Sequence, residues 1–329
     1  MRFQRFPMPI PFGWFFVHYS DDLRIGDVKT LRYFGQDLVL FRNEGGEAGM
    51  LDAYCPHLGA HLGHGGQVVG DSIQCPFHAW QFRPDGFCSG IPYASQIPPK
   101  LLTEPAAQCW PLVERNGVVW AWYHPEKKAP WFEVQAYDEF EAQSGWSQHR
   151  REWRFASNPQ EIAENGVDMA HFQFVHKMEA VPEGQSSYEG HIRTSTAQGA
   201  STLTLPDGSS KTVARSVKTV QNGAGQKFTR ISGLVDLALM VLATPVEADL
   251  VELRFCINWP TVAADSAEYK MVQMAIETLC GQKGIEGDIP IWENKIYRAK
   301  PLLCDGDGPI FRFRKYFEQF YINPPPVAL

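Results

Sequence analysis

The first third of the chain alternates short apolar runs with turn-forming residues, a pattern that predicts β-strands rather than helices. The pairs Gly70-Asp71 and Asn116-Gly117 lie between such runs, and these residue types tolerate the positive φ of tight hairpin turns. We therefore expect a small all-β domain that ends near His124. The strands are expected at 38–41, 67–69, 72–74, 112–113 and 118–120.

A charged stretch that ends in proline, residues 126–130, has the character of a linker. We place one domain at residues 1–128 and a second at 129–329. A chain of 329 residues is long enough for two domains that each bury a core.

The second domain shows helix signals and strand signals together. Asn158 followed by Pro159 is typical of a helix start, and we expect this helix to run through Met169 and Ala170. Strand-forming residues follow between 202 and 260, which predicts an antiparallel sheet with helices packed on it, an α+β arrangement. Turns are expected at 206–208, 222–223 and 244–245. Helical segments are expected at 311–321 and over 267–298, the latter with interruptions at 281, 284, 287 and 290.

Composition removes several classes of function. The chain has 30 Lys and Arg against 37 Asp and Glu, a net charge of −7 that argues against binding nucleic acid. Prolines at 7, 9 and 11 interrupt the apolar start, so we expect no signal peptide. The most apolar internal stretch, residues 234–243, is too short for a membrane span and contains Asp236. Seven cysteines are an odd number for a disulfide framework and favour a reducing, cytoplasmic location.

Two pairs of metal-binding residues stand in the first domain. Cys55 and His57 form the first pair, and Cys75 and His78 form the second. Zinc sites usually place like ligands together, whereas a Rieske [2Fe–2S] centre uses two Cys on one iron and two His on the other. The mixed pairs match the second arrangement, although zinc and chance pairing remain alternatives. Seven further residues are expected to serve as packing or loop residues: His61, His64, Cys88, Cys109, Cys256, Cys280 and Cys304.

A third group of candidate residues lies in the second domain. Asp168 and His171 would share one face of a helix, whereas His171 and His176 would diverge by about 140°. The helix must therefore loosen or end between the two histidines if both bind one ion. Two histidines with one distant carboxylate form the facial triad of non-haem Fe(II) oxygenases. A buried Asp with two hydrogen-bonded histidines is the alternative.

These motifs resemble those of the Rieske non-haem iron oxygenases. The two Cys-His pairs look like the Rieske signature, and residues 168–176 are similar to the family's D-x₂-H-x₄-H motif. The resemblance covers nearly the whole chain. It implies an N-terminal all-β Rieske domain, a helix-grip catalytic domain, a [2Fe–2S] cluster held by the two pairs, and mononuclear Fe(II) held by His171 and His176.

The same resemblance suggests the remaining ligand and a linking residue. Asp288 lies in a stretch similar to the D-x₃-W-x₂-K element that carries the iron carboxylate in steroid-active members, with Glu286 and Glu293 as rivals. Asp168 would hydrogen-bond His171 and, across a trimer interface, His78. The resemblance thus implies a homotrimer.

Two branches of the family are most similar, the 3-ketosteroid 9α-hydroxylases and the cholesterol 7-desaturases. The resemblance implies an oxygenase component that hydroxylates or desaturates a steroid or sterol with O₂. Because no Gly-rich dinucleotide motif is present, electrons would come from a separate NAD(P)H-dependent ferredoxin reductase or ferredoxin.

Two other functions stay open on the sequence. The substrate could be another apolar or aromatic compound, since the only residue-level argument for a steroid pocket is a set of apolar side chains that serve equally well as core. Alternatively, the chain could be a zinc-stabilised helix-grip protein that binds an apolar ligand without catalysis. The apolar side chains in question are Phe172, Phe174, Leu239 and Met240.

Overall fold

A computed structural model of the chain divides into two compact units. The small unit spans Trp14–Val134, and the large unit combines the chain up to Gly13 with the chain from Gln135 onward. The linker predicted at 126–130 lies just before the boundary at 134/135. The structure describes residues 5–141, 145–178, 181, 184–204, 210–233 and 235–323.

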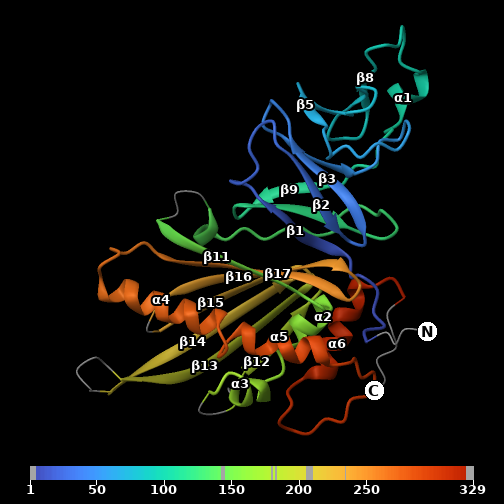
Figure 1. The fold of residues 1–329 in the computed structure, drawn as a ribbon. Helices are drawn as coiled ribbons and strands as arrows, with labels where there is room; N and C mark the ends of the chain where they lie inside the picture. The colour runs from blue at the N-terminus through green and yellow to red at the C-terminus, as the bar shows by residue number, and fades with distance from the viewer. Residues whose placement is uncertain are drawn as a thin grey trace. The chain divides into compact units, whose positions relative to one another are not determined.

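The small unit consists of three antiparallel sheets with strand orders β1-β10-β9, β2-β3-β4 and β5-β6-β7-β8 (Figure 1). The predicted hairpins are confirmed, and the turn between β9 and β10 has positive φ at Asn116 (58°) and Gly117 (71°). The elements are β1 (Gly13–Tyr19), β2 (Val28–Tyr33), β3 (Gln36–Arg42), β4 (Ala48–Asp52), β5 (Gln67–Val69), β6 (Ser72–Gln74), β7 (Gln81–Phe82), β8 (Cys88–Gly90), β9 (Leu112–Arg115), β10 (Val118–Tyr123) and the short helix α1 (Pro99–Thr103).

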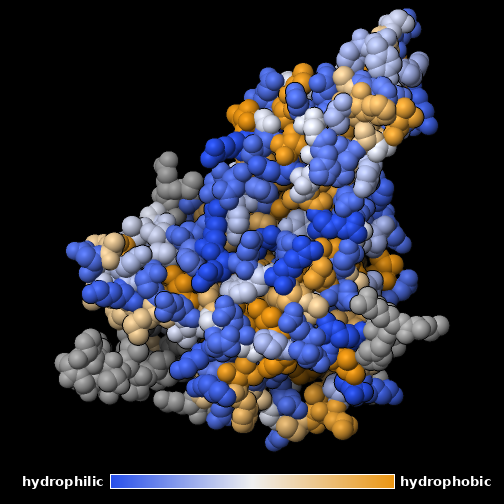
Figure 2. Space-filling model, in the orientation of Figure 1, coloured by the Kyte–Doolittle hydropathy of each residue, from blue (hydrophilic) through white to orange (hydrophobic). Residues whose placement is uncertain are grey.

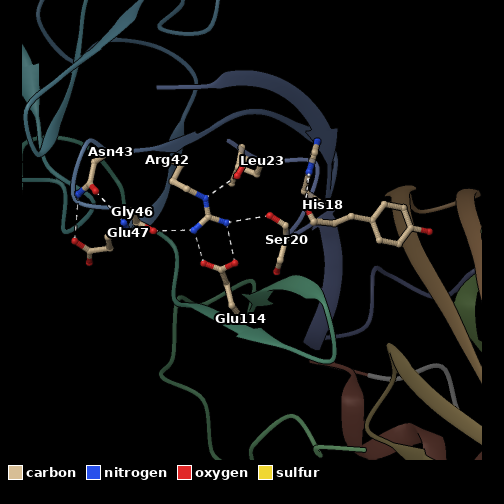
Figure 3. Close-up of polar contacts among 9 residues, drawn as sticks. His18, Ser20, Leu23, Arg42, Asn43, Gly46, Glu47 and Glu114 are labelled. Carbon is tan, nitrogen blue, oxygen red and sulfur yellow. Dashed lines mark hydrogen bonds and ion pairs between the residues drawn. The ribbon is translucent and has the colours of Figure 1, made fainter. Parts of the chain in front are cut away.

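Arg42 at the end of β3 joins several segments of the small unit (Figure 3). Its guanidinium forms two hydrogen bonds of 2.7 and 2.8 Å with the Glu114 carboxylate. It also donates to the carbonyl oxygens of Leu23 (2.7 Å) and Gly46 (2.8 Å). The guanidinium lowers the pKa of Glu114, so the pair stays charged at neutral pH. These contacts hold β3, β9 and two loops in a fixed relation.

The large unit is built on one antiparallel sheet of order β11-β17-β16-β15-β14-β13-β12. Figure 1 shows α4 and α5 lying across one face of this sheet. None of the helices within the described ranges has the length and hydropathy that crossing a bilayer requires. The strands are β11 (Trp146–Phe155), β12 (Gly184–Glu189), β13 (Ile192–Thr204), β14 (Ser210–Asn222), β15 (Gln226–Ser232), β16 (Leu237–Glu247) and β17 (Leu250–Pro260). The helices are η1 (Asp138–Phe140), α2 (Pro159–Glu164), α3 (Ala170–Phe174), α4 (Ala267–Cys280), α5 (Ile285–Asn294), α6 (Ile310–Phe317) and η2 (Glu318–Phe320).

The core of the large unit lies between the sheet and these helices. Val241 and Leu253 of the sheet belong to one buried cluster with Val272 and Ile276 of α4 and Trp292 of α5. The Trp292 ring also stacks on Phe155 of β11, with centroids 5.5 Å apart. This packing fixes α5 against the sheet, as the predicted α+β arrangement requires.

The prediction of one continuous helix from Asn158 through Met169 and Ala170 is wrong. Asn158 does cap α2, since its side chain accepts a hydrogen bond from the Gln160 backbone N–H (3.0 Å). However, α2 ends at Glu164 and α3 begins only at Ala170. Gly166 weakens the helix at this point, and its carbonyl oxygen accepts a 2.6 Å hydrogen bond from Arg193 instead of serving a helical turn.

A second correction concerns the break expected at Thr244-Pro245. Both residues lie inside β16, and the pairing with β17 shifts register between Pro245 and Glu247. A bulge accommodates a proline because the ladder hydrogen bond that proline cannot donate is already interrupted there. The turn at 222–223 is confirmed, since β14 ends at Asn222. The turn expected at 206–208 lies outside the described residues.

Candidate metal centres

The two Cys-His loops of the small unit have the same backbone hydrogen bonds. The N–H of Cys55 donates to the carbonyl of Ala60 (2.8 Å), and the N–H of Gly59 donates back to the Cys55 carbonyl (2.9 Å). In the second loop, the N–H of Cys75 donates to the Trp80 carbonyl (2.7 Å) and that of Ala79 to the Cys75 carbonyl (3.1 Å). The backbone of each loop is therefore closed in the same way, although the histidine follows its cysteine by two residues in the first loop and by three in the second.

The four candidate ligands differ in exposure within this arrangement. Cys55 and Cys75 are each 3% exposed and belong to the hydrophobic core, whereas His57 and His78 are only partly buried. The two imidazole rings lie 4.9 Å apart between centroids. Burial, reinforced by the neighbouring Cys75, raises the pKa of the Cys55 thiol to about 11. An inner pair of sulfurs and an outer pair of imidazoles fit a Rieske [2Fe–2S] cluster.

Aromatic residues surround the outer side of the two loops. The ring of Trp80 stacks on His57 with centroids 4.5 Å apart, and its indole N–H donates to the Tyr93 hydroxyl (2.8 Å). Leu58 and Phe77, next to the two candidate histidines, are 64% and 61% exposed. Figure 2 shows a mainly hydrophilic surface that is interrupted by hydrophobic areas. The loops thus present apolar side chains beside the imidazoles.

The histidines of the large unit lie at the end of α3. His171 is in the helix, which ends at Phe174, and the N–H groups of Val175 (2.7 Å) and His176 (3.4 Å) both donate to the His171 carbonyl. The last of these bonds spans five residues and widens the turn. The expectation that the helix must loosen or end between the histidines is confirmed. Their rings lie 4.9 Å apart between centroids.

Asp288 of α5 completes a group of three potential ligands. Its Oδ2 atom is 3.4 Å from Nε2 of His176, and one ligand atom of each of His171, His176 and Asp288 lies within 4.8 Å of the others. Asp288 is 6% exposed. Burial lowers the pKa of His171, which favours the neutral imidazole that a metal requires. Two imidazoles and one carboxylate fit a mononuclear Fe(II) site.

The rival carboxylates on α5 are placed differently. Glu293 is exposed and Glu286 is half-buried. Neither belongs to a group of ligand atoms within metal-binding distance in the described part of the chain. α5 can lie close to the end of α3 because residue 287 is a glycine. A Cβ atom there would lie 3.3 Å from Cγ1 of Val175 and 2.6 Å from the Gln282 carbonyl oxygen.

Asp168 contacts His171 through both its backbone and its side chain, since its carboxylate accepts a hydrogen bond from the His171 backbone N–H (3.4 Å). Its carbonyl oxygen accepts a hydrogen bond from Nδ1 of His171, while its carboxylate oxygen is 3.9 Å from the same nitrogen and the side chain is 40% exposed. With Nδ1 occupied, Nε2 is the His171 nitrogen left for a metal. Asn165, which sequence reasoning missed, has its amide nitrogen 3.4 Å from that Nε2.

Ion pairs hold the helices around the triad. Glu164 of α2 forms two hydrogen bonds of 2.7 and 2.8 Å with Arg314 of α6, and Glu161 lies 2.6 Å from Lys295 at the end of α5. Both glutamates are buried. The first pair connects α2, which leads into the His171 segment, with α6, and the second connects it with the end of α5, which carries Asp288.

The apolar residues considered for a pocket do not form one group. Phe174 is 69% exposed, and Leu239 is part of the core under the helices. Met240, the next residue on β16, points to the opposite face of the sheet from Leu239.

Comparison with known proteins covers both units. The Rieske [2Fe-2S] domain model matches residues 13–108, and the 3-Ketosteroid 9alpha-hydroxylase C-terminal domain model matches residues 121–321. The oxygenase component of a 3-ketosteroid-9-alpha-monooxygenase from Rhodococcus rhodochrous is 32% identical over 96% of this chain and 84% of its own length. Cholesterol 7-desaturase from Xenopus laevis is 31% identical over 97% of this chain and 74% of its own.

The fold is also that of solved oxygenases. The crystal structure of dicamba monooxygenase bound to dicamba aligns with a TM-score of 0.73, at 17% identity, over 94% of this chain and 96% of that chain. The two units and their candidate sites define an enzyme with a Rieske [2Fe–2S] cluster and a mononuclear non-haem iron. The chain belongs to the Rieske oxygenase family that contains the 3-ketosteroid 9α-hydroxylases and cholesterol 7-desaturases.

Proposed function

We propose that the protein is an oxygenase component that hydroxylates or desaturates an unactivated C–H position of a steroid or sterol. The observation that carries the proposal is the match of residues 121–321 to a steroid hydroxylase domain that includes the His171, His176 and Asp288 group. In hydroxylation one atom of O₂ enters the C–H bond and the other leaves as water, with two electrons and two protons consumed. Desaturation removes two hydrogen atoms and gives two waters from the same input.

Seven side chains are the proposed ligands. Cys55 and Cys75 would hold one iron of the cluster and His57 and His78 the other, as their exposure supports. The mononuclear iron would be held by His171, His176 and Asp288. When bound, these groups supply one-electron transfer and a site where O₂ is activated.

The surrounding residues prepare the mononuclear site. The Asp168 carbonyl holds the proton on Nδ1 of His171, which directs the lone pair of Nε2 toward the metal position. Burial keeps this imidazole neutral, and the Asp288 carboxylate beside His176 provides the negative charge that favours a divalent cation.

The electron path is proposed to run between subunits. Asp168 has a partly exposed carboxylate that is available to a second histidine. In a homotrimer this carboxylate would link His171 with His78 of the partner subunit. The exposed Leu58 and Phe77 next to the cluster ligands would then be covered by the neighbouring subunit.

The electrons would come from a separate NAD(P)H-dependent reductase or ferredoxin, since the similar Rhodococcus protein is named an oxygenase component. We place both proteins in the cytoplasm, where the cysteine thiols of this chain would stay reduced.

Turnover with a surrogate reductase tests the proposal. The metal-loaded protein is given 3-ketosteroids, sterols and aromatic acids, and O₂ uptake and product mass are measured, with Asp288→Ala as the inactive control. We expect steroid-dependent uptake and a product that gains one oxygen atom or loses two hydrogen atoms. A colourless protein that binds only zinc, or turnover of aromatic acids alone, would contradict the proposal.

A further inference from the structure

The segment between α2 and α3 surrounds the ring of His171. The Asp168 carbonyl oxygen accepts a hydrogen bond from Nδ1 of His171, and the Asn165 amide nitrogen lies 3.4 Å from Nε2. The Asp168 carboxylate also accepts a hydrogen bond from the His171 backbone N–H (3.4 Å). Gly166 lies between Asn165 and Asp168 in the chain. Its position therefore affects the groups beside both nitrogens of this proposed iron ligand.

Arg193 of β13 holds the carbonyl side of this segment. Its Nη2 atom donates a 2.6 Å hydrogen bond to the Gly166 carbonyl. The Val167 N–H points back instead and donates to the Glu164 carbonyl of α2 (2.9 Å). A Cβ atom at residue 166 would lie 3.1 Å from Nη1 of Arg193, so the guanidinium also packs directly against this backbone. The segment is thus held by α2 on one side and by a distant strand on the other.

The guanidinium of Arg193 is not placed to form a salt bridge. Arg193 is fully buried (0% exposed), and no acidic side chain in the described ranges pairs with it. It also donates to the Ser186 hydroxyl (3.3 Å) and lies 5.8 Å from the centroid of the Phe313 ring. Burial lowers the pKa of Arg193, but a guanidinium stays protonated at neutral pH. A buried cation without an anion is costly, and the low dielectric around it strengthens its hydrogen bond with the Gly166 carbonyl.

We propose that Arg193 is a positioning residue of the mononuclear iron site. By fixing the Gly166 carbonyl it fixes the Asp168 carbonyl two residues later, which sets the plane of the His171 ring and the direction of its Nε2 lone pair. The inference rests on the ligand set of the proposed function and adds a residue outside that set. Lysine would replace Arg193 only in part, because the planar guanidinium presents its donors in a fixed geometry.

Fe(II) binding without turnover tests this role. Protein that holds its cluster, but has lost the mononuclear iron to a chelator, is titrated anaerobically with Fe(II). We expect Arg193→Met to bind Fe(II) about tenfold to a hundredfold more weakly than the wild type, as for other groups that orient a ligand, with Arg193→Lys between them. Arg312→Met is the matched control and should bind Fe(II) as the wild type does. Arg312 is exposed and lies over the Tyr188 ring, 4.9 Å from its centroid.

A spectroscopic measurement separates positioning from a general effect on stability. Each protein is saturated with Fe(II) and exposed to nitric oxide, and the electron paramagnetic resonance signal of the adduct is recorded. The shape of this signal depends on how the ligands are arranged around the iron. It should change in Arg193→Met and stay the same in Arg312→Met. A lower melting temperature of Arg193→Met, with unchanged affinity and signal, would show a merely structural role and overturn the proposal.

Gly166→Ala tests the same contact from the other side. Gly166 does not have a positive φ, so alanine suits the backbone, but its Cβ atom would crowd Nη1 of Arg193. We expect weaker Fe(II) binding. Because both changes disrupt one contact, the double variant with Arg193→Met should lose less affinity than the two single losses combined, and additive losses would contradict the proposal.

Two further outcomes separate this role from the proposed function. Wild-type affinity and signal in Arg193→Met would overturn the role of Arg193 alone. If that variant does not fold, the same result in Gly166→Ala and Arg193→Lys decides the question. A wild-type protein that binds no Fe(II) beside its cluster would overturn the proposed iron site, and the role of Arg193 with it.

Discussion

The ligand loops of the small unit and the triad of the large unit bring metal-binding side chains together by different means. Each loop is a closed local structure in which the residue four positions after the cysteine donates back to it. The triad joins His171 and His176, at the end of one short helix, to Asp288 of a helix more than a hundred residues later. The loops depend on nearby backbone, whereas the triad depends on how distant elements pack.

This difference has a consequence for how each site tolerates change. The loop backbones are fixed by hydrogen bonds within a few residues, and their cysteines belong to the core of the small unit. The triad is held by the stacking of Trp292 on Phe155, by the close approach at Gly287 and by the ion pairs of α2. Changes far from the triad in sequence should therefore reach it, while the loops should respond only to local changes.

The largest expected effects come from removing one ligand at each site. Asp288→Ala should lose the mononuclear iron and reduce turnover by more than the roughly 100-fold seen for groups that only support a ligand. The visible spectrum of the cluster should stay intact. Cys75→Ala should do the opposite, with the cluster lost and iron still bound by the triad. Metal analysis and visible absorption of both variants measure the separation.

Glu293→Ala is the matched control for the first variant. Glu293 lies on the same helix as Asp288 but is exposed. Its variant should keep both metals and full turnover. Loss of the mononuclear iron from Glu293→Ala, or its retention in Asp288→Ala, would contradict the proposed ligand set.

Asp168 tests whether the two sites communicate. Asp168→Asn should keep the backbone carbonyl that holds Nδ1 of His171, and both metals should remain bound. Turnover should fall about 10- to 100-fold, because the partly exposed carboxylate is the proposed link to the cluster of another subunit. Stopped-flow reoxidation of the reduced cluster measures the step directly. An unchanged rate in a fully loaded variant would rule this role out.

The same contrast explains what could be predicted from the sequence. Both hairpins and the two Cys-His pairs follow from signals a few residues long, and so does the Asn158 cap. Gly166 was a local signal for the break after Glu164, but the hydrogen bond that Arg193 of a distant strand donates to the Gly166 carbonyl could not be predicted.

Gly287 should show that the triad depends on packing. A Cβ atom there would be 3.3 Å from Val175, next to His176, and 2.6 Å from a carbonyl of the preceding turn. Gly287→Ala should push α5 away from α3 and weaken iron binding about tenfold, as for other changes behind a ligand. Gly199→Ala on β13, where nothing lies within 4 Å, is the control. Titration of the metal-free proteins with Fe(II) measures the affinity, and equal affinities would contradict the packing account.

The smallest expected effect concerns a backbone position that the two ligand loops share, which is glycine in one loop and alanine in the other. Gly59 and Ala79 occupy the same position and both have positive φ, 77° and 57°. Gly59→Ala should cost about 1–2 kcal/mol, the strain of placing a Cβ in the left-handed region, because no atom lies within 4 Å to add a clash. Ala79→Gly should be nearly neutral, since the relief of strain offsets the larger chain entropy of glycine. Calorimetric melting should show a lower transition temperature for Gly59→Ala only, with the cluster spectrum unchanged in both variants. An equal decrease in transition temperature for both variants would contradict this prediction. It would mean that the two loops differ in backbone energetics although their hydrogen bonds match.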